Sequence, residues 1–274
     1  MDRLHPLVVQ RAWGANHLEI RVLAKHGVER LDLRNEDLPQ LLSRAPSRFR
    51  SVSVTVVFSV NRPIARSALS RFSHNQSARA LLADPANASR GTDKVLWRVW
   101  LQQPSRRRVE LFRPTSSLAE VVGGDENRYW HYSPAQGSVD IVEFKEQRQP
   151  GTVAFTTWLH PMVSELLAPE FLWYGVDGAV HDPHLEIIEE LRFLDRKALR
   201  AHMTVTDWDT RFVRWSENIC VADLYDLIID ESTGTILRVG CLLDGVEFSV
   251  TEIVTLAFDE DLDQNLFEPP LPAR

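Results

Sequence analysis

Two histidines, His181 and His184, form the pattern in this sequence that comes nearest to a metal site. Structural zinc takes four side-chain ligands and catalytic zinc takes three. Pro183 forces an extended backbone between the two imidazoles, and no further ligand type follows nearby. The sequence therefore predicts a solvated loop here, with no bound metal and no other cofactor.

The remaining titratable residues do not assemble into a catalytic pattern. His131 would need an orienting carboxylate to act as a general base, and the sequence does not identify one. Glu189 and Glu190 are neighbours on an expected strand and so point to opposite faces, which excludes an acid–base dyad. The acidic run 259–263 lacks the glycine of a calcium loop. Phosphate-loop, nucleophile-elbow and zinc-protease motifs are absent, so the sequence favours a non-catalytic protein.

The two cysteines and the charges give little further chemistry. Cys220 and Cys241 form no CxxC motif, and we expect buried free thiols in strands. Residues 1–108 hold 19 basic and 8 acidic side chains, whereas residues 109–274 hold 12 and 30. The halves either complement each other within one fold, or the basic half binds an anionic lipid or nucleic acid. The overall charge of −7 gives no bias toward nucleic acid, and none is expected as a partner.

The first fourteen residues contain no apolar run long enough for a secretory signal, and no run of 18–20 apolar residues occurs in the chain. We therefore expect a soluble, cytoplasmic protein without a transmembrane segment. The length of 274 residues suits a single large β-domain.

Alternation of apolar and polar residues predicts a protein dominated by strands. A hairpin is expected over 18–33, a helix over about 35–45 and an amphipathic helix over about 64–82. A further helix opens at His160-Pro161, with Met162, Leu166, Leu167 and Phe171 at helical spacing. Asp244-Gly245 is typical of a two-residue type I′ hairpin turn. Strands are expected over 51–60, 95–101, 108–112, 118–122, 129–132, 139–144, 185–194, 198–206, 221–229, 236–243 and 246–258.

Aromatic residues concentrate in the central strands and the helix that follows them. Such stripes usually form core. The alternative is an apolar groove that stays open for a ligand.

Short motifs in this order resemble the lipoprotein-carrier (LolA-like) superfamily and its RseB-type relatives. The order is an amphipathic helix, the strand Leu96–Pro104, a glycine-acidic turn, the segment Arg128–Pro134 and the C-terminal Phe267-Glu268-Pro269-Pro270. The resemblance covers about 38–270. It implies an open half-barrel whose concave face binds acyl chains or a partner's disordered segment. Two departures stand out, since the carriers have a signal peptide and a basic residue where this chain has Gln103.

We therefore expect an α+β fold, in which one large curved antiparallel sheet wraps one or two helices. Residues 1–274 form a single LolA-like domain, with an N-terminal hairpin and helix extension over 1–50. The expected function is non-catalytic binding of a hydrophobic small molecule, lipid or extended peptide on the concave face. An RseB-type regulatory protein-binding module and an accessory enzyme that uses the cavity remain as alternatives. The candidate ligand-binding residues are Phe58, Trp97, Trp100, Phe112, Trp130, Leu166, Leu167 and Phe171.

Overall fold

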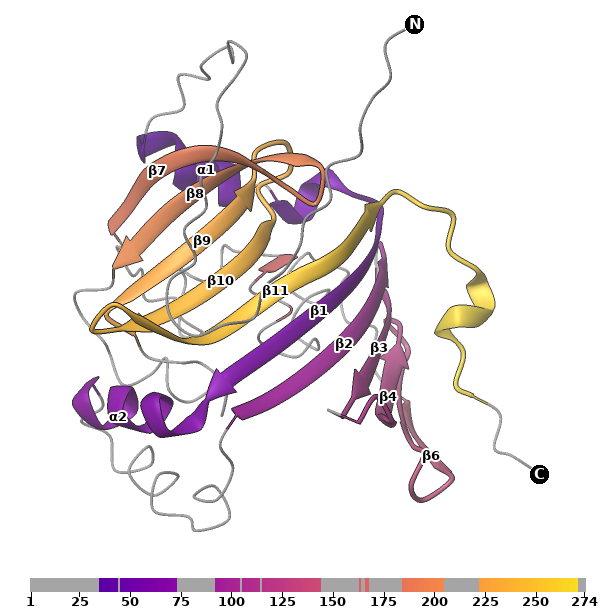
Figure 1. Ribbon diagram of the computed structural model, residues 1–274. Coiled ribbons are helices and arrows are strands. Elements are labelled where there is room, and N and C mark those ends of the chain that lie inside the picture. The colour runs from indigo at the N-terminus through magenta and orange to yellow at the C-terminus, as the bar shows by residue number, and fades with distance from the viewer. Residues whose placement is uncertain are drawn as a thin grey trace, which may run out of the picture. The chain divides into compact units, whose positions relative to one another are not determined.

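The computed structural model describes residues 35–43, 45–72, 92–103, 105–113, 115–143, 163, 166–167, 184–204 and 222–270 (Figure 1). The chain divides into two compact units, Met1–Asp32 and Leu33–Arg274. The hairpin predicted over 18–33 lies outside the described residues. Every feature reported below belongs to the second unit.

One antiparallel sheet of eleven strands dominates this unit, in the order β6-β5-β4-β3-β2-β1-β11-β10-β9-β8-β7. Because β6 and β7 are opposite edges of the sheet, it is open and not a closed barrel. Figure 1 shows the broad side of β8–β10 but β3 and β4 nearly edge-on, so the sheet curves. The predicted class, one large antiparallel sheet with few helices, is confirmed. The strands are β1 (Ser51–Asn61), β2 (Thr92–Gln102), β3 (Arg106–Phe112), β4 (Leu118–Gly124), β5 (Arg128–Ser133), β6 (Ser138–Glu143), β7 (His184–Phe193), β8 (Arg196–Thr204), β9 (Leu224–Asp230), β10 (Ile236–Leu243) and β11 (Val246–Phe258).

The described helices are short. Helix α1 (Leu38–Ser43) lies between two 3₁₀ turns, Asn35–Asp37 and Ala45–Arg48, and buries its three leucines. Helix α2 (Arg62–Phe72) follows β1 directly, whereas the sequence predicted a helix over 64–82. The residues between 72 and 92 lie outside the description. No helix in the described part is long and apolar enough to cross a membrane.

The alternating sequence of β1 explains why this strand sits at the centre of the sheet. Val54, Val56 and Phe58 are buried on one face, which we call the inner face. Ser53 and Thr55 lie on the opposite, outer face and are partly exposed. β-branched and aromatic residues at every second position suit a pleated strand with one buried face. Strand β1 pairs with β2 on one side and with β11 on the other, so it joins the two halves of the sheet.

The hairpin turn predicted at Asp244-Gly245 is confirmed. Both residues have positive φ, 51° for Asp244 and 77° for Gly245. Leu243 pairs with Val246 across the turn, which leaves two loop residues. This is the arrangement that a type I′ turn requires, and it sets where β10 ends and β11 begins.

Candidate functional site

The inner face is apolar across the centre of the sheet. Pairing of β1 with β2 aligns Val56 with Trp97 and Val54 with Val99. The rings of Phe58 and Trp97 are tilted against each other with their centroids 6.1 Å apart, and both side chains are buried. The same face continues into the other half of the sheet through the buried residues Leu199, Ala201, Met203, Tyr225, Leu227 and Ile253.

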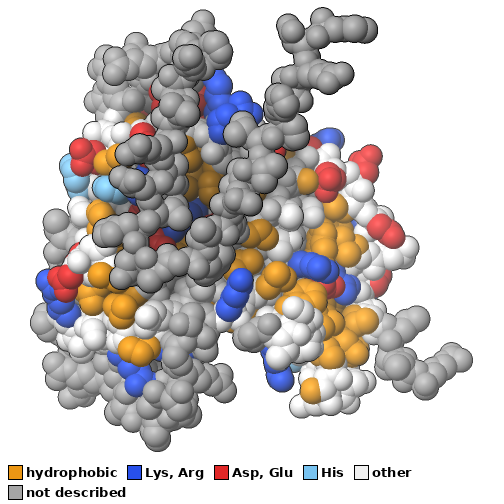
Figure 2. Space-filling model, in the orientation of Figure 1, with side chains coloured by type: hydrophobic (Ala, Val, Ile, Leu, Met, Phe, Trp, Pro, Cys, Tyr) orange, Lys and Arg blue, Asp and Glu red, His pale blue; other side chains and the backbone are white. Residues whose placement is uncertain are grey.

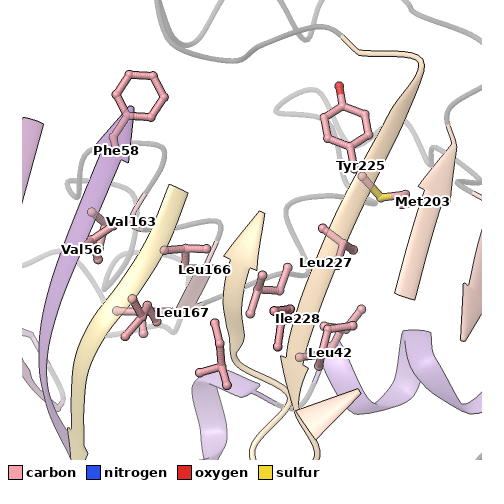
Figure 3. Packing of buried hydrophobic residues seen from close by; sticks show 14 of the residues in the cluster. Leu42, Val56, Phe58, Val163, Leu166, Leu167, Met203, Tyr225, Leu227 and Ile228 are labelled. Atoms are coloured by element: carbon pink, nitrogen blue, oxygen red, sulfur yellow. The ribbon is translucent and has the colours of Figure 1, made fainter. Parts of the chain in front are cut away.

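A separate segment covers part of this face. Val163, Leu166 and Leu167 are completely or almost completely buried and belong to the same hydrophobic cluster as the inner-face residues. Figure 3 shows them among Val56 and Leu227 of the sheet. The structure thus brings four predicted site residues together, namely Phe58, Trp97, Leu166 and Leu167. Phe171, also a candidate, lies outside the described residues.

Three other candidates lie on the outer face. Trp100 is three residues from Trp97 and pairs with Ser53, so it points away from the inner face. Phe112 pairs with Leu96 and lies under the guanidinium of Arg98, 4.9 Å from the ring centroid. Trp130 also faces outward, because it pairs with Gly123 on the same face as Trp100. The eight candidates therefore cannot line one cavity, because the sheet itself separates them.

Trp130 is fully buried on the outer face beneath the C-terminal segment. Its Nε1 donates a hydrogen bond to the carbonyl of Phe267 at 3.1 Å. The Arg108 guanidinium lies 5.7 Å from the ring centroid and donates to the carbonyl of Leu266 at 3.0 Å. Gly123 pairs with Trp130, and a Cβ atom at Gly123 would overlap the indole ring. The two sequence motifs that carry the family resemblance are therefore in contact, and this contact is structural.

We call the part of the chain that makes this contact, Gln264–Glu268, the C-terminal clasp. Its 3₁₀ turn η5 (Gln264–Phe267) is capped by the Asp263 side chain, which accepts from the Asn265 N–H at 2.9 Å. Glu268 accepts two hydrogen bonds from Arg128 at 2.7 Å. This ion pair is the main cause of the raised pKa of Arg128. Figure 1 shows η5 beside β3 and β4, apart from the rest of the sheet.

The structure supplies the carboxylate that the sequence could not identify for His131. Nε2 of His131 lies 3.3 Å from Oε2 of Glu120 on the neighbouring strand. Both side chains are substantially exposed, at 32% and 46%. An exposed pair of this kind contributes little to stability. Tyr129, two positions before His131 on β5, has a raised pKa because it is half-buried and near Glu120.

The other chemical candidates are dispersed. Glu189 faces Arg200 across β7 and β8 and bonds to it at 3.2 Å, while Glu190 pairs with Leu199, so the two glutamates do not share a site. His184 begins β7 and is exposed, and His181 lies outside the description. Cys241 is buried. Within the described ranges, no group of three His, Cys, Asp or Glu side chains is placed to hold a metal ion.

An ion-pair network across β7–β11 on the outer face was not predicted from the sequence. Asp226 is buried and accepts from Arg200 at 2.7 Å and from Arg238 at 3.3 Å. Arg238 also pairs with Glu247, and its Nε lies 3.7 Å from Glu252. The hydrogen bond to Asp226 is the main reason that the pKa of Arg200 is raised. Since each charge has a partner of opposite sign, the network holds strands together and offers no free reactive group.

Asp230, at the end of β9, is the most buried charge of the sheet. Burial opposes its ionisation, but bonds from the Arg196 guanidinium, the Ser232 hydroxyl and the Thr233 N–H outweigh burial and keep its pKa below the ordinary value. The carboxylate thus organises the turn 230–235 between β9 and β10. The sequence pattern alone, Asp-Glu-Ser-Thr-Gly, indicates only a turn.

Comparison with known proteins gives similarity in structure only. No protein-family model and no curated protein matches this sequence. An uncharacterized conserved protein from Thermus thermophilus is similar with a TM-score of 0.43 and 12% identity, over 87% of this chain and 96% of that one. The MucA/MucB complex of Pseudomonas aeruginosa gives a TM-score of 0.45 and 12% identity over 88% of this chain, which spans 62% of the matched chain. A LolA superfamily protein from Nitrosomonas europaea gives 0.31 and 12%, over 86% and 98%.

Proposed function

We propose that this protein is a non-catalytic binder that takes up an apolar ligand, a lipid acyl chain in the first instance, against the inner face of its sheet. The observation that carries this proposal is the continuous apolar inner face, which is covered at its centre by a separate segment. Phe58 and Trp97 form its aromatic part, and Leu166 and Leu167 are the covering residues. The resemblance to lipoprotein carriers suggests the acyl chain as the ligand to test first.

The physical basis is the exchange of one apolar contact for another. The covering leucines hide the inner face from water, and an acyl chain that displaces them would hide it equally well. Burying ten methylene groups offers about 8 kcal/mol before the costs of association, which corresponds to micromolar affinity if those costs are small. Displacing Val163, Leu166 and Leu167 would break no strand pairing, because none of these three residues is part of a strand.

The position of the two tryptophans on β2 allows a sharp test. A dibrominated stearic acid quenches tryptophan emission only near the bromine atoms. We expect saturable quenching at micromolar concentration in the 274-residue protein, and a clear loss of the quenched fraction in Trp97→Phe. The matched control is Trp100→Phe, which removes an indole from the other face of the same strand and should leave the quenched fraction unchanged.

Two results would count against an apolar ligand on this face. One is quenching that Trp100→Phe removes and Trp97→Phe does not, since the acid would then bind the outer face. The other is the absence of quenching, together with native mass spectra of gently purified protein that show no bound lipid. The remaining function would then be the RseB-type protein-binding module, which is supported by the open strand edge at β6.

A further inference from the structure

The two edges of the sheet are built differently. At the β7 edge, a bulge between Ile187 and Glu189 breaks the regular register. The outward N–H of Ile187 is already bound, since it donates to Oδ1 of Asn35 at 2.8 Å. Glu186, Glu189 and Glu190 add exposed charge. Bulges, covering groups and charges are the devices by which proteins prevent another chain from adding to a sheet.

The β6 edge carries two carboxylates but has no bulge, and no residue of the described part covers it. Strand β6 pairs with β5 in unbroken register over all six of its residues, Ser138–Glu143. Ile141 and Val142 are exposed to 53% and 54%, one on each face of the strand. Among the large hydrophobic residues of the described part, only Val246 is as exposed, and it lies beside a hairpin turn. A regular edge with exposed apolar side chains is a template for strand addition.

Charge indicates which kind of strand would fit. Asp140 and Glu143 flank the apolar pair, and neither carboxylate forms a hydrogen bond or ion pair with another described residue. Arg128, which lies opposite Glu143 in the register, is bound to Glu268 and Asp125 instead. A strand placed alongside β6 would place two consecutive residues opposite Ile141 and Val142. The residues before and after this pair in the added strand would each lie opposite a carboxylate.

We propose that the β6 edge is a docking site for an extended peptide of another protein that carries two consecutive apolar residues between two basic ones. The peptide adds as a twelfth strand, and its main chain bonds to the free edge of β6. Lysine or arginine at its first and fourth positions pairs with Asp140 and Glu143. A second copy of this chain fits less well, because two β6 strands would bring these carboxylates together. The site is independent of the inner face and of the ligand proposed for it.

The probe is an acetylated and amidated nonapeptide with the central sequence Lys-Val-Ile-Lys between threonines, measured by fluorescence polarisation on the complete chain. We expect the fluorescence polarisation of the peptide to reach a plateau as the protein concentration is raised to about 1 mM. Ile141→Ser should weaken it at least fivefold, whereas Ile188→Ser, at the blunted β7 edge, should leave it unchanged. Asp140→Asn and Glu143→Gln should each weaken binding about two- to fivefold, the range of an exposed ion pair. Ile141 and Ile188 are both exposed, so neither substitution should prevent folding.

Two N-methylated peptides test main-chain pairing directly. Methyl groups on alternate amide nitrogens block one edge of the added strand, and the two alternating sets block opposite edges. One set should abolish binding and the other should spare it. Equal effects of both sets, unchanged affinity for Ile141→Ser, or no binding at 1 mM would overturn the proposal. A dimer in gel filtration that Ile141→Ser disrupts would also overturn it, because the edge would then be occupied by a second copy.

Discussion

At the scale of single residues, the buried carboxylate of Asp230 shows how a turn acquires a fixed shape. The sequence Asp230-Glu231-Ser232-Thr233-Gly234 predicts a turn by composition. Its geometry depends on Asp230, which accepts from the Ser232 and Thr233 N–H groups at 2.8 and 3.0 Å and pairs with Arg196. Arg196 is more than thirty residues away along the chain, so no local pattern could have identified this partner.

We expect Asp230→Asn to lower the free energy of unfolding by about 2 kcal/mol at pH 7, because the buried amide would lack the negative charge that pairs with Arg196. Urea unfolding monitored by circular dichroism measures this. Asp261→Asn is the matched control, since Asp261 is exposed and should change stability by less than about 0.5 kcal/mol.

The same substitution has a defined pH dependence. The pKa of Asp230 is lower in the folded protein than in the unfolded chain, so its stabilisation is fully present above about pH 4. It is lost as the pH falls from there through the folded-state pKa. The difference between wild type and Asp230→Asn should therefore shrink in acid below about pH 4. A difference that stays constant down to pH 2 would show that ionisation of Asp230 plays no part.

At position 245, the backbone conformation alone determines why glycine is favoured. Its φ of 77° is unfavourable for a side chain, whereas a Cβ atom there would meet no other atom within 4 Å. Gly245→Val should therefore cost about 1–2 kcal/mol through backbone strain and not through a clash. Gly245→Asn should cost less than half as much, since asparagine tolerates this region. Equal melting temperatures for the valine variant and the wild type would contradict the turn.

At the scale of elements, the strands could be predicted throughout, whereas the described residues test the helix predictions only in part. All eleven strands occur where alternation indicated them, because a strand with one buried face is encoded by its own residues. Helix α2 was predicted over 64–82 but is described only over 62–72. Residues 73–91 lie outside the described part, so the end predicted near 82 stays a prediction. The eight candidate site residues were predicted without the strand register, and the register decides that Trp97 and Trp130 lie on opposite faces.

The C-terminal clasp is the element whose role sequence reasoning missed. The signal was present, since Phe267-Glu268-Pro269-Pro270 and Trp130 were both recognised as motifs, but their contact spans 137 residues. Phe267→Ala should lower the free energy of unfolding by about 2–4 kcal/mol and expose Trp130, which shifts its emission to longer wavelength. Glu268→Gln should cost under about 1 kcal/mol, because this ion pair is partly exposed. Similar losses for both variants would mean that charge and not apolar burial holds the clasp.

At the scale of the molecule, the two halves of the chain meet in the centre of one sheet. Strand β1 of the basic half pairs with β11 of the acidic half. Ion pairs join Arg50 to Asp259 and Arg71 to Asp244 across the same division. Of the two interpretations of the charge asymmetry, these contacts favour complementarity within the fold. All four side chains are largely exposed, so these ion pairs only assist the association of the two halves. The apolar cluster stabilises that association.

This arrangement predicts that the two arms of the sheet unfold together. Val56 is fully buried between Trp97 of β2 and Ile253 of β11, so the apolar cluster runs through the central pair of strands without interruption. Once the five other tryptophans of the chain are replaced by phenylalanine, those at positions 97, 100 and 130 report on one arm, and the buried thiol of Cys241 reports on the other. In a Cys220→Ser background, the urea midpoints for tryptophan emission and for pulse labelling of Cys241 should coincide. Val56→Ala should shift both by the same amount, equivalent to about 1–3 kcal/mol. Midpoints that separate, or a Val56→Ala effect confined to one probe, would show instead that the arms are independent folding units that share an edge.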